Sequence, residues 1–199
     1  MTTEKRESAF GELEKRALWA LEHSEEIEPR ETIRHLWRQM RLWHYPSNGL
    51  YKSWTVSVSM PPDRDDARPM VREITWDRPF DRDVLSGAPD SSGHELTIEP
   101  TLKVRDAYLP VKELKSLFET AIDLDIRMIG VKEPFGLEGE TFGLEGYGPL
   151  HGIRLEWWCE GPEEWRDLTT WAAEMREFVK SCTDFGELEA DWEAARKGE

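Results

Sequence analysis

The most concentrated group of side chains that could do chemistry is a row of four arginines, Arg30, Arg34, Arg38 and Arg41. Their spacings of four, four and three would align them on one face of a helix. Guanidinium groups aligned in this way can hold a phosphate, a carboxylate or an acidic partner. The same row can equally be a solvated face that pairs with Glu31 and with acidic neighbours. Both interpretations stay open, and they make Arg34, Arg38 and Arg41 candidate ligand contacts.

Trp158 is a second candidate, as a contact for a partner. Ile153, Leu155, Trp157 and Cys159 alternate along a predicted strand with charged residues and with Trp158. Successive side chains of a strand point to opposite faces, so Trp157 is expected in the core and Trp158 on the other face. Trp158 is then either covered by the N-terminal helices or exposed and available to a partner.

No pattern of residues matches a known catalytic or cofactor-binding motif. The chain lacks the HExxH and G-x-S-x-G motifs and the glycine patterns that bind dinucleotides or nucleotide phosphates. The acidic residues at 63–66 lack the spacing of a calcium-binding EF-hand. The five histidines are scattered and form no Cys–His zinc pattern. We therefore expect no catalytic residue, no cofactor and no metal ion.

The element with the clearest periodicity is the stretch from residue 139 to residue 182. It predicts a strand at Glu140–Tyr147, a tight turn, a strand at His151–Cys159 and a helix at Pro162–Cys182. Pro162 suits the start of a helix, where its missing N–H costs nothing. This stretch is expected to anchor the core.

The rest of the chain predicts further helices and strands. Helices are expected at 3–23, at about 29–44 and from Pro110 onward, a helical turn at 77–85, and strands at 51–60, 70–76 and 96–108. Residues 126–131 are short, apolar and ambiguous.

Short connections between these strands predict an antiparallel sheet, and hence an α+β fold. We expect about five strands with the C-terminal helices on one face and the N-terminal helix pair on the other face or at an edge. The expected parts are a helical pair at 1–46, an α+β sandwich at 47–185 and a polar tail or short helix at 186–199. Together they would form one integrated domain.

Composition narrows the class of partner. The net charge is −15, which argues against a nucleic-acid or anionic-membrane binder and is compatible with a basic protein partner or with plain solubility. Hydrophobic residues make up 38% of the chain and include ten tryptophans, enough for a folded core.

The two cysteines, Cys159 and Cys182, are expected to be buried and reduced, although a disulfide between them stays possible. No signal peptide or membrane span is evident, so we expect a cytoplasmic protein.

Part of the stretch from residue 139 to residue 182 resembles a motif of uncharacterised bacterial α+β proteins. The matching residues are Gly139-Glu-Thr-Phe-Gly-Leu144, Leu155-Glu-Trp-Trp158 and Pro162-Glu-Glu-Trp-Arg-Asp-Leu168. The resemblance covers about thirty residues, and such proteins often have Phe in place of Leu155. It implies a bacterial origin and an α+β fold, and it implies no activity.

Two hypotheses of function follow. The first is a non-enzymatic bacterial interaction protein, such as an immunity protein or an inhibitor, which binds a basic protein through acidic and aromatic surface. The second is a domain that binds or hydrolyses a small anionic ligand between the N-terminal helices and the sheet, with Arg34, Arg38 and Arg41 holding the anion. The oligomeric state does not follow from the sequence.

Overall fold

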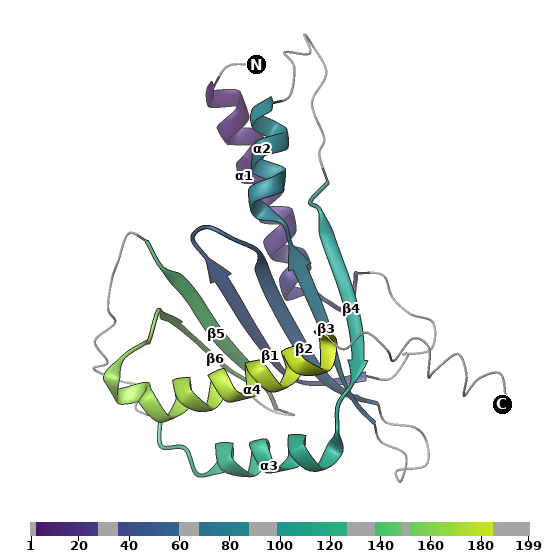
Figure 1. The fold of residues 1–199 in the computed structure, drawn as a ribbon, viewed down its shortest axis with the longest axis vertical. Coiled ribbons are helices and arrows are strands. Elements are labelled where there is room, and N and C mark those ends of the chain that lie inside the picture. The colour runs from purple at the N-terminus through teal and green to yellow at the C-terminus, as the bar shows by residue number, and fades with distance from the viewer. Residues whose placement is uncertain are drawn as a thin grey trace, which may run out of the picture.

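The protein is an α+β fold built on one six-stranded antiparallel sheet (Figure 1). The computed structural model describes residues 3–27, 36–59, 68–87, 99–126, 138–148 and 152–184. The strands are β1 (Leu36–Pro46), β2 (Tyr51–Ser59), β3 (Pro69–Trp76), β4 (Leu102–Tyr108), β5 (Glu140–Tyr147) and β6 (Gly152–Trp158). The helices are α1 (Thr3–Glu22), α2 (Arg78–Gly87), α3 (Val111–Ile122) and α4 (Arg166–Asp184), with a 3-10 turn, η2 (Glu163–Trp165), leading into α4.

The strand order is β4-β3-β2-β1-β5-β6, and every neighbouring pair is antiparallel. The first four strands form a meander that runs outward from β1. The hairpin of β5 and β6 pairs with the other edge of β1, so β1 joins two parts of the chain that lie about a hundred residues apart.

The two faces of the sheet carry different cores. Helix α4 crosses one face, where its apolar side shares a core with Met40, Leu42, Trp54, Leu144 and Trp157, and α3 packs beside α4. Helix α1 covers part of the other face through a smaller cluster that includes Leu21, Ile74 and Trp76. The first half of α1 extends past the end of the sheet, where α2 packs beside it (Figure 1).

The predicted second helix, at about 29–44, is wrong from residue 36 onward, because this part of the chain is β1. Its register against β2 shifts between Arg38 and Met40, which marks a β-bulge at Gln39. The extra residue places Arg38 and Arg41 on the same face although they are three apart, because they pair with Ser57 and Thr55. A bulged strand therefore produces a spacing that is otherwise typical of a helix. Residues 29–35 lie outside the described residues.

Most of the other helices and strands match those predicted from the sequence. The helices predicted at 3–23 and from Pro110 are confirmed, and so are the strands at 51–60, 70–76, 140–147 and 151–159, within two residues at each end. The helix predicted at 162–182 is also present, but it starts with the 3-10 turn η2 and is α-helical only from Arg166. The strand predicted at 96–108 is described only from residue 102 as β4, and residues 96–98, 127–131 and 186–199 lie outside the described part. The sheet has six strands rather than five because β1 joins it, and the boundary expected after residue 46 falls between two paired strands.

Candidate functional site

A pocket of about 680 Å³ lies between the first half of α4 and the strands β1, β5 and β6. Its apolar wall includes Leu42, Phe142 and Trp157, which point to the α4 side of the sheet. The turn from Cys159 to Pro162 closes one end of the pocket. Pockets of this size and mixed lining are typical of sites that bind a small molecule or an inserted side chain.

Charged side chains surround this apolar wall. Glu160, Glu163, Glu174, Arg166 and Arg176 line the pocket. Arg166 donates a hydrogen bond to Glu163 at 3.1 Å, so these two charges offset each other. Glu160 and Glu174 are exposed, and neither carboxylate forms an ion pair within the part of the chain that the structure describes. The lining thus carries a net negative charge with two carboxylates available.

A row of aromatic rings forms the floor of the pocket and continues beside it. Phe142 stacks on Trp157 at 6.4 Å between ring centroids and on His44 at 4.6 Å. The Arg176 guanidinium lies 4.6 Å from the centre of the Phe142 ring on the α4 side. Burial lowers the pKa of Arg176, against the opposing effect of Glu177 and Glu140. Arg176 is therefore held against Phe142 as part of the wall.

His44 is the titratable group next to this row. Its Nε2 atom lies 3.2 Å from a carboxylate oxygen of Glu140. Burial lowers the pKa of His44, and this effect outweighs the contribution of Glu140, which raises it. The ring is accordingly neutral around pH 7.

The turn that closes the pocket has an unusual backbone. Cys159 has a φ of 50°, and Gly161 has a φ of 76°. A Cβ atom on Gly161 would lie 2.9 Å from Cδ1 of Trp157, so glycine is needed both for conformation and for space. Cys159 is exposed, contrary to the prediction that it is buried, because β6 ends at Trp158 and the chain turns before Cys159 can join the apolar face. Both cysteines are free, and burial raises the pKa of the Cys182 thiol.

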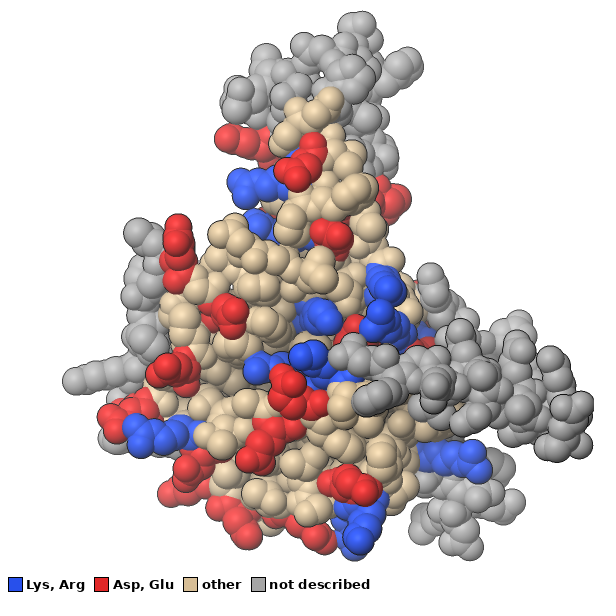
Figure 2. All heavy atoms as spheres, in the orientation of Figure 1, with Lys and Arg blue, Asp and Glu red and all other residues tan. Residues whose placement is uncertain are grey.

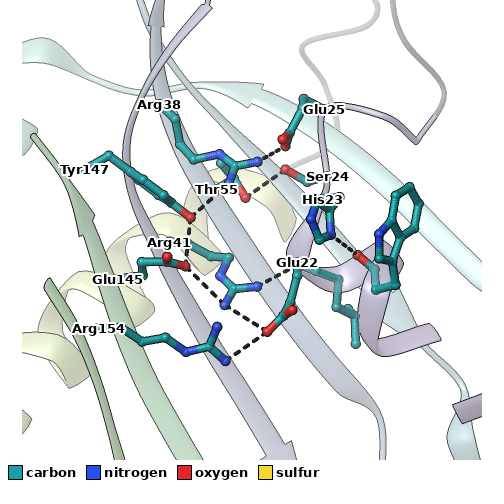
Figure 3. A network of polar contacts seen from close by, with 12 residues as sticks. Glu22, His23, Ser24, Glu25, Arg38, Arg41, Thr55, Glu145, Tyr147 and Arg154 are labelled. Atoms are coloured by element: carbon teal, nitrogen blue, oxygen red, sulfur yellow. Dashed lines mark hydrogen bonds and ion pairs between the residues drawn. The ribbon is translucent and has the colours of Figure 1, made fainter. Parts of the chain in front are cut away.

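The arginines singled out in the sequence lie on the opposite face of the sheet, against the end of α1. Figure 3 shows Arg38 and Arg41 from β1 and Arg154 from β6 pointing toward the residues that end α1 and follow it. Arg38 forms an ion pair with Glu25 and donates a hydrogen bond to the Tyr147 hydroxyl at 2.9 Å. Arg154 donates a hydrogen bond to Glu22 at 2.8 Å.

Arg41 is the centre of this network and is only 1% exposed. Its Nη2 atom lies 3.3 Å from Glu145 and 3.5 Å from Glu22. Its guanidinium also lies 4.5 Å from the centre of the Trp43 ring. Burial alone would raise the pKa of Glu22, but Arg154 and Arg41 outweigh it and hold that pKa below its usual value. The network therefore fastens α1 to the sheet with charges that already neutralise one another.

The residues predicted to form a site lie at two separate places in the structure or outside the described part. Arg38 and Arg41 lie together but face internal carboxylates, while Arg30 and Arg34 lie outside the described residues. Trp157 is buried in the core as predicted, at 5% exposure. Trp158 is half-buried on the opposite face, and its ring lies against Gly139, where an added Cβ would come within 2.5 Å of Cζ2.

Sequence reasoning missed the pocket that the structure forms at α4. Its lining comes from β1, β5, β6, η2, α4 and the turn before η2, so no local motif in the sequence marks it.

Within the described ranges, no three His, Cys, Asp or Glu side chains are grouped so that they could hold a metal ion. No described helix has the length and apolar character needed to cross a membrane. Comparison of the chain with protein-family models, curated proteins and solved structures finds no match.

Proposed function

We propose that this chain is a non-enzymatic interaction domain of the bacterial cytoplasm, of the immunity or inhibitor type, that binds a basic protein. The observation that carries the proposal is the acidic surface around the first half of α4. Figure 2 shows more Asp and Glu than Lys and Arg side chains on this part of the molecule. Residues 138–184 contain eleven acidic and four basic residues, a net charge of −7 out of −15 for the whole chain.

The acidic surface differs from the arginine network in one respect that matters for binding. The arginines of the network are paired inside the protein, whereas Glu160, Glu164 and Glu174 are exposed and form no ion pair with the described residues. Exposed charge of one sign attracts a partner of the other sign and accelerates the encounter. This contrast favours a basic partner at α4 over an anionic ligand between α1 and the sheet.

The test compares two charge-reversed variants in affinity capture from the host at 150 mM salt. Glu164→Lys with Asp167→Lys changes the acidic surface outside the pocket lining. Glu7→Lys with Asp83→Lys makes the same change of charge on α1 and α2, where both side chains are exposed.

We expect a stoichiometric basic protein with the natural chain and with the α1–α2 variant, and its loss with the α4 variant. Raising the salt concentration should release the partner, because screening shortens the range of the attraction. Absence of any stoichiometric partner, or equal capture by both variants, would contradict the proposal.

A further inference from the structure

The geometry points to the pocket at α4 as the anchor point for one arginine or lysine side chain of the partner. This inference rests on the proposed function and names the chemical group that the acidic surface recognises.

The charges of the pocket favour a cation. Glu160 and Glu174 line the pocket from the turn after β6 and from α4, and neither is paired with a cation among the described residues. A guanidinium or ammonium group placed between them would gain charge-assisted hydrogen bonds. The third carboxylate, Glu163, already accepts a hydrogen bond from Arg166 and is not counted among the available acceptors.

The aromatic wall provides a second attraction for the same group. Trp157 lines the pocket, and indole is the ring that binds a cation most strongly over its face. Phe142 already contacts the guanidinium of Arg176, and Trp43, which also lines the pocket, contacts those of Arg41 and Arg154. Trp157 has no such cation contact with the described residues, so it is the ring that an incoming cation can use.

Trp157 also carries an unused donor. Its side chain is 5% exposed, and its indole N–H has no hydrogen bond to the described residues, yet this atom is not among the fully buried polar atoms. Because the N–H is reachable from the pocket, a main-chain carbonyl beside an inserted Arg or Lys could accept a hydrogen bond from it. Two carboxylate acceptors and one N–H donor around an aromatic wall match a basic side chain together with its own peptide group.

An anionic ligand is the competing occupant, because two arginines also line the pocket. Arg166 forms an exposed ion pair with Glu163, and Arg176 is 3.9 Å from Glu177 and lies over Phe142. An anion would have to approach the two available carboxylates, which would repel it. The charges therefore favour the cation, and the experiment separates the two.

The experiment follows the tryptophan indole N–H signals of the full ¹⁵N-labelled chain by NMR. The Trp157 signal is assigned by its loss in Trp157→Phe. The probes are blocked tripeptides Gly-X-Gly in which X is arginine, lysine or norleucine, and inorganic phosphate. The pocket variant is Glu160→Gln with Glu174→Gln, and the matched control is Glu164→Gln with Asp167→Asn, which removes two charges outside the pocket lining.

We expect the arginine and lysine peptides to shift the Trp157 signal saturably, with dissociation constants of about 1 mM, and the norleucine peptide to leave it unchanged. The pocket variant should weaken this binding by about tenfold or more, and the control by less than about threefold. The unchanged signals of the other tryptophans would verify that the pocket variant is folded.

Three results would overturn the inference. They are an equal shift with the norleucine peptide, binding that the pocket variant retains, and a shift caused by phosphate and abolished by Arg176→Gln. If peptides fail to bind while the Glu164→Lys, Asp167→Lys variant still releases the partner, the pocket is not the anchor and the proposed function stands. If peptides bind and no basic partner exists, the proposed function fails by itself.

Discussion

Gly143 lies directly opposite Trp43 in the pairing of β1 with β5. A Cβ atom on Gly143 would come within 1.9 Å of Cζ2 of Trp43, whose side chain is 1% exposed. The indole ring crosses the strand at this position because glycine leaves the space free. The ring in turn carries the guanidinium of Arg41, so one missing side chain makes room for the central contact of the network.

We expect Gly143→Ala to lower the free energy of unfolding by about 1–3 kcal/mol or more, because Trp43 is buried and has little room to move. Urea denaturation measures the change. The matched control is Gly11→Ala in α1, where an added Cβ meets nothing within 4 Å. The control should raise stability by about 0.5–1 kcal/mol, since alanine is the better helix former. Equal effects of the two substitutions would contradict the role given to Gly143.

His44 should make stability depend on pH. Burial lowers the pKa of His44 from its usual value of 6.5, so the unfolded chain binds this proton more readily than the folded chain does. The stabilising contribution is therefore complete above about pH 6.5 and is lost as the pH falls toward the folded pKa, with a slope of at most about 1.4 kcal/mol per pH unit.

The measurement is the free energy of unfolding of the natural chain and of His44→Gln between pH 5 and pH 8. The variant should show a smaller loss of stability on acidification, and Glu140→Gln should show a larger one, because Glu140 raises the pKa of His44. Parallel curves for the natural chain and His44→Gln would rule out the histidine as a source of the dependence.

At the scale of elements, Arg41 determines how α1 is attached to the sheet. We expect Arg41→Ala to cost about 1.5–3 kcal/mol, because it removes a buried guanidinium that Glu145 and Glu22 share, although both carboxylates are partly exposed and Glu22 keeps Arg154. Arg154→Ala is the matched control, since Arg154 also pairs with Glu22 but its side chain is 51% exposed, and it should cost no more than about 1 kcal/mol.

Urea denaturation gives the two values, and hydrogen exchange of the α1 amides tells whether the helix detaches. Faster exchange confined to α1 in Arg41→Ala would support the attachment, and exchange unchanged in α1 would contradict it.

The bulge in β1 leads to another prediction for this strand. Deleting Gln39 leaves Arg38 and Met40 opposite Ser57 and Val56, which are adjacent in β2. The shortened strand can therefore pair regularly and keep Arg38 and Arg41 on one face. We expect the deletion to lower the free energy of unfolding by less than about 1.5 kcal/mol. An alanine inserted between Leu42 and Trp43 should lower it several times more, because the insertion moves the side chains of one part of β1 to the opposite faces of the sheet.

Denaturant midpoints of the two variants would check this difference. A deletion as damaging as the insertion would mean that the bulge is itself required.

The same bulge explains which parts of the fold the sequence could predict. Regular periodicity was sufficient to predict α1, α4 and the hairpin of β5 and β6, because the pattern of apolar residues in these elements is uninterrupted. In β1 the bulge puts Trp37 and Met40 on one face, three residues apart, and so imitates a helix. The pairing of Arg41 with Glu145 was not predictable, because it depends on contact between β1 and a strand about a hundred residues later.

The pocket was not predictable for a similar reason. Its lining combines Leu42 from β1, Phe142 from β5, Trp157 from β6 and Glu174 from α4. Each of these residues has an ordinary role in its own element, and only their packing together encloses a space.

At the scale of the whole molecule, the net charge of −15 should make stability depend on salt. Raising NaCl from 10 to 100 mM shortens the screening length from about 30 to about 10 Å and weakens the repulsion between acidic residues. We expect the Tm to rise by about 2–4 °C, the shift that about 1 kcal/mol produces in a chain of this size.

The variant Glu7→Lys with Asp83→Lys, whose net charge is smaller by four, should show a smaller rise. Calorimetry would measure both values, and a Tm that falls with salt would mean that surface ion pairs dominate instead.

The position of β1 in the sheet also has a consequence for how the chain folds. Strands β1 to β4 follow one another and pair with their neighbours in sequence, so they can assemble locally. The hairpin of β5 and β6 must instead find β1 across a long loop, and closing a long loop is slow compared with forming a hairpin. We expect refolding to form the meander first and to bring in β5, β6 and α4 later. The pocket, which lies on the seam between the two parts, would then be the last feature of the molecule to appear.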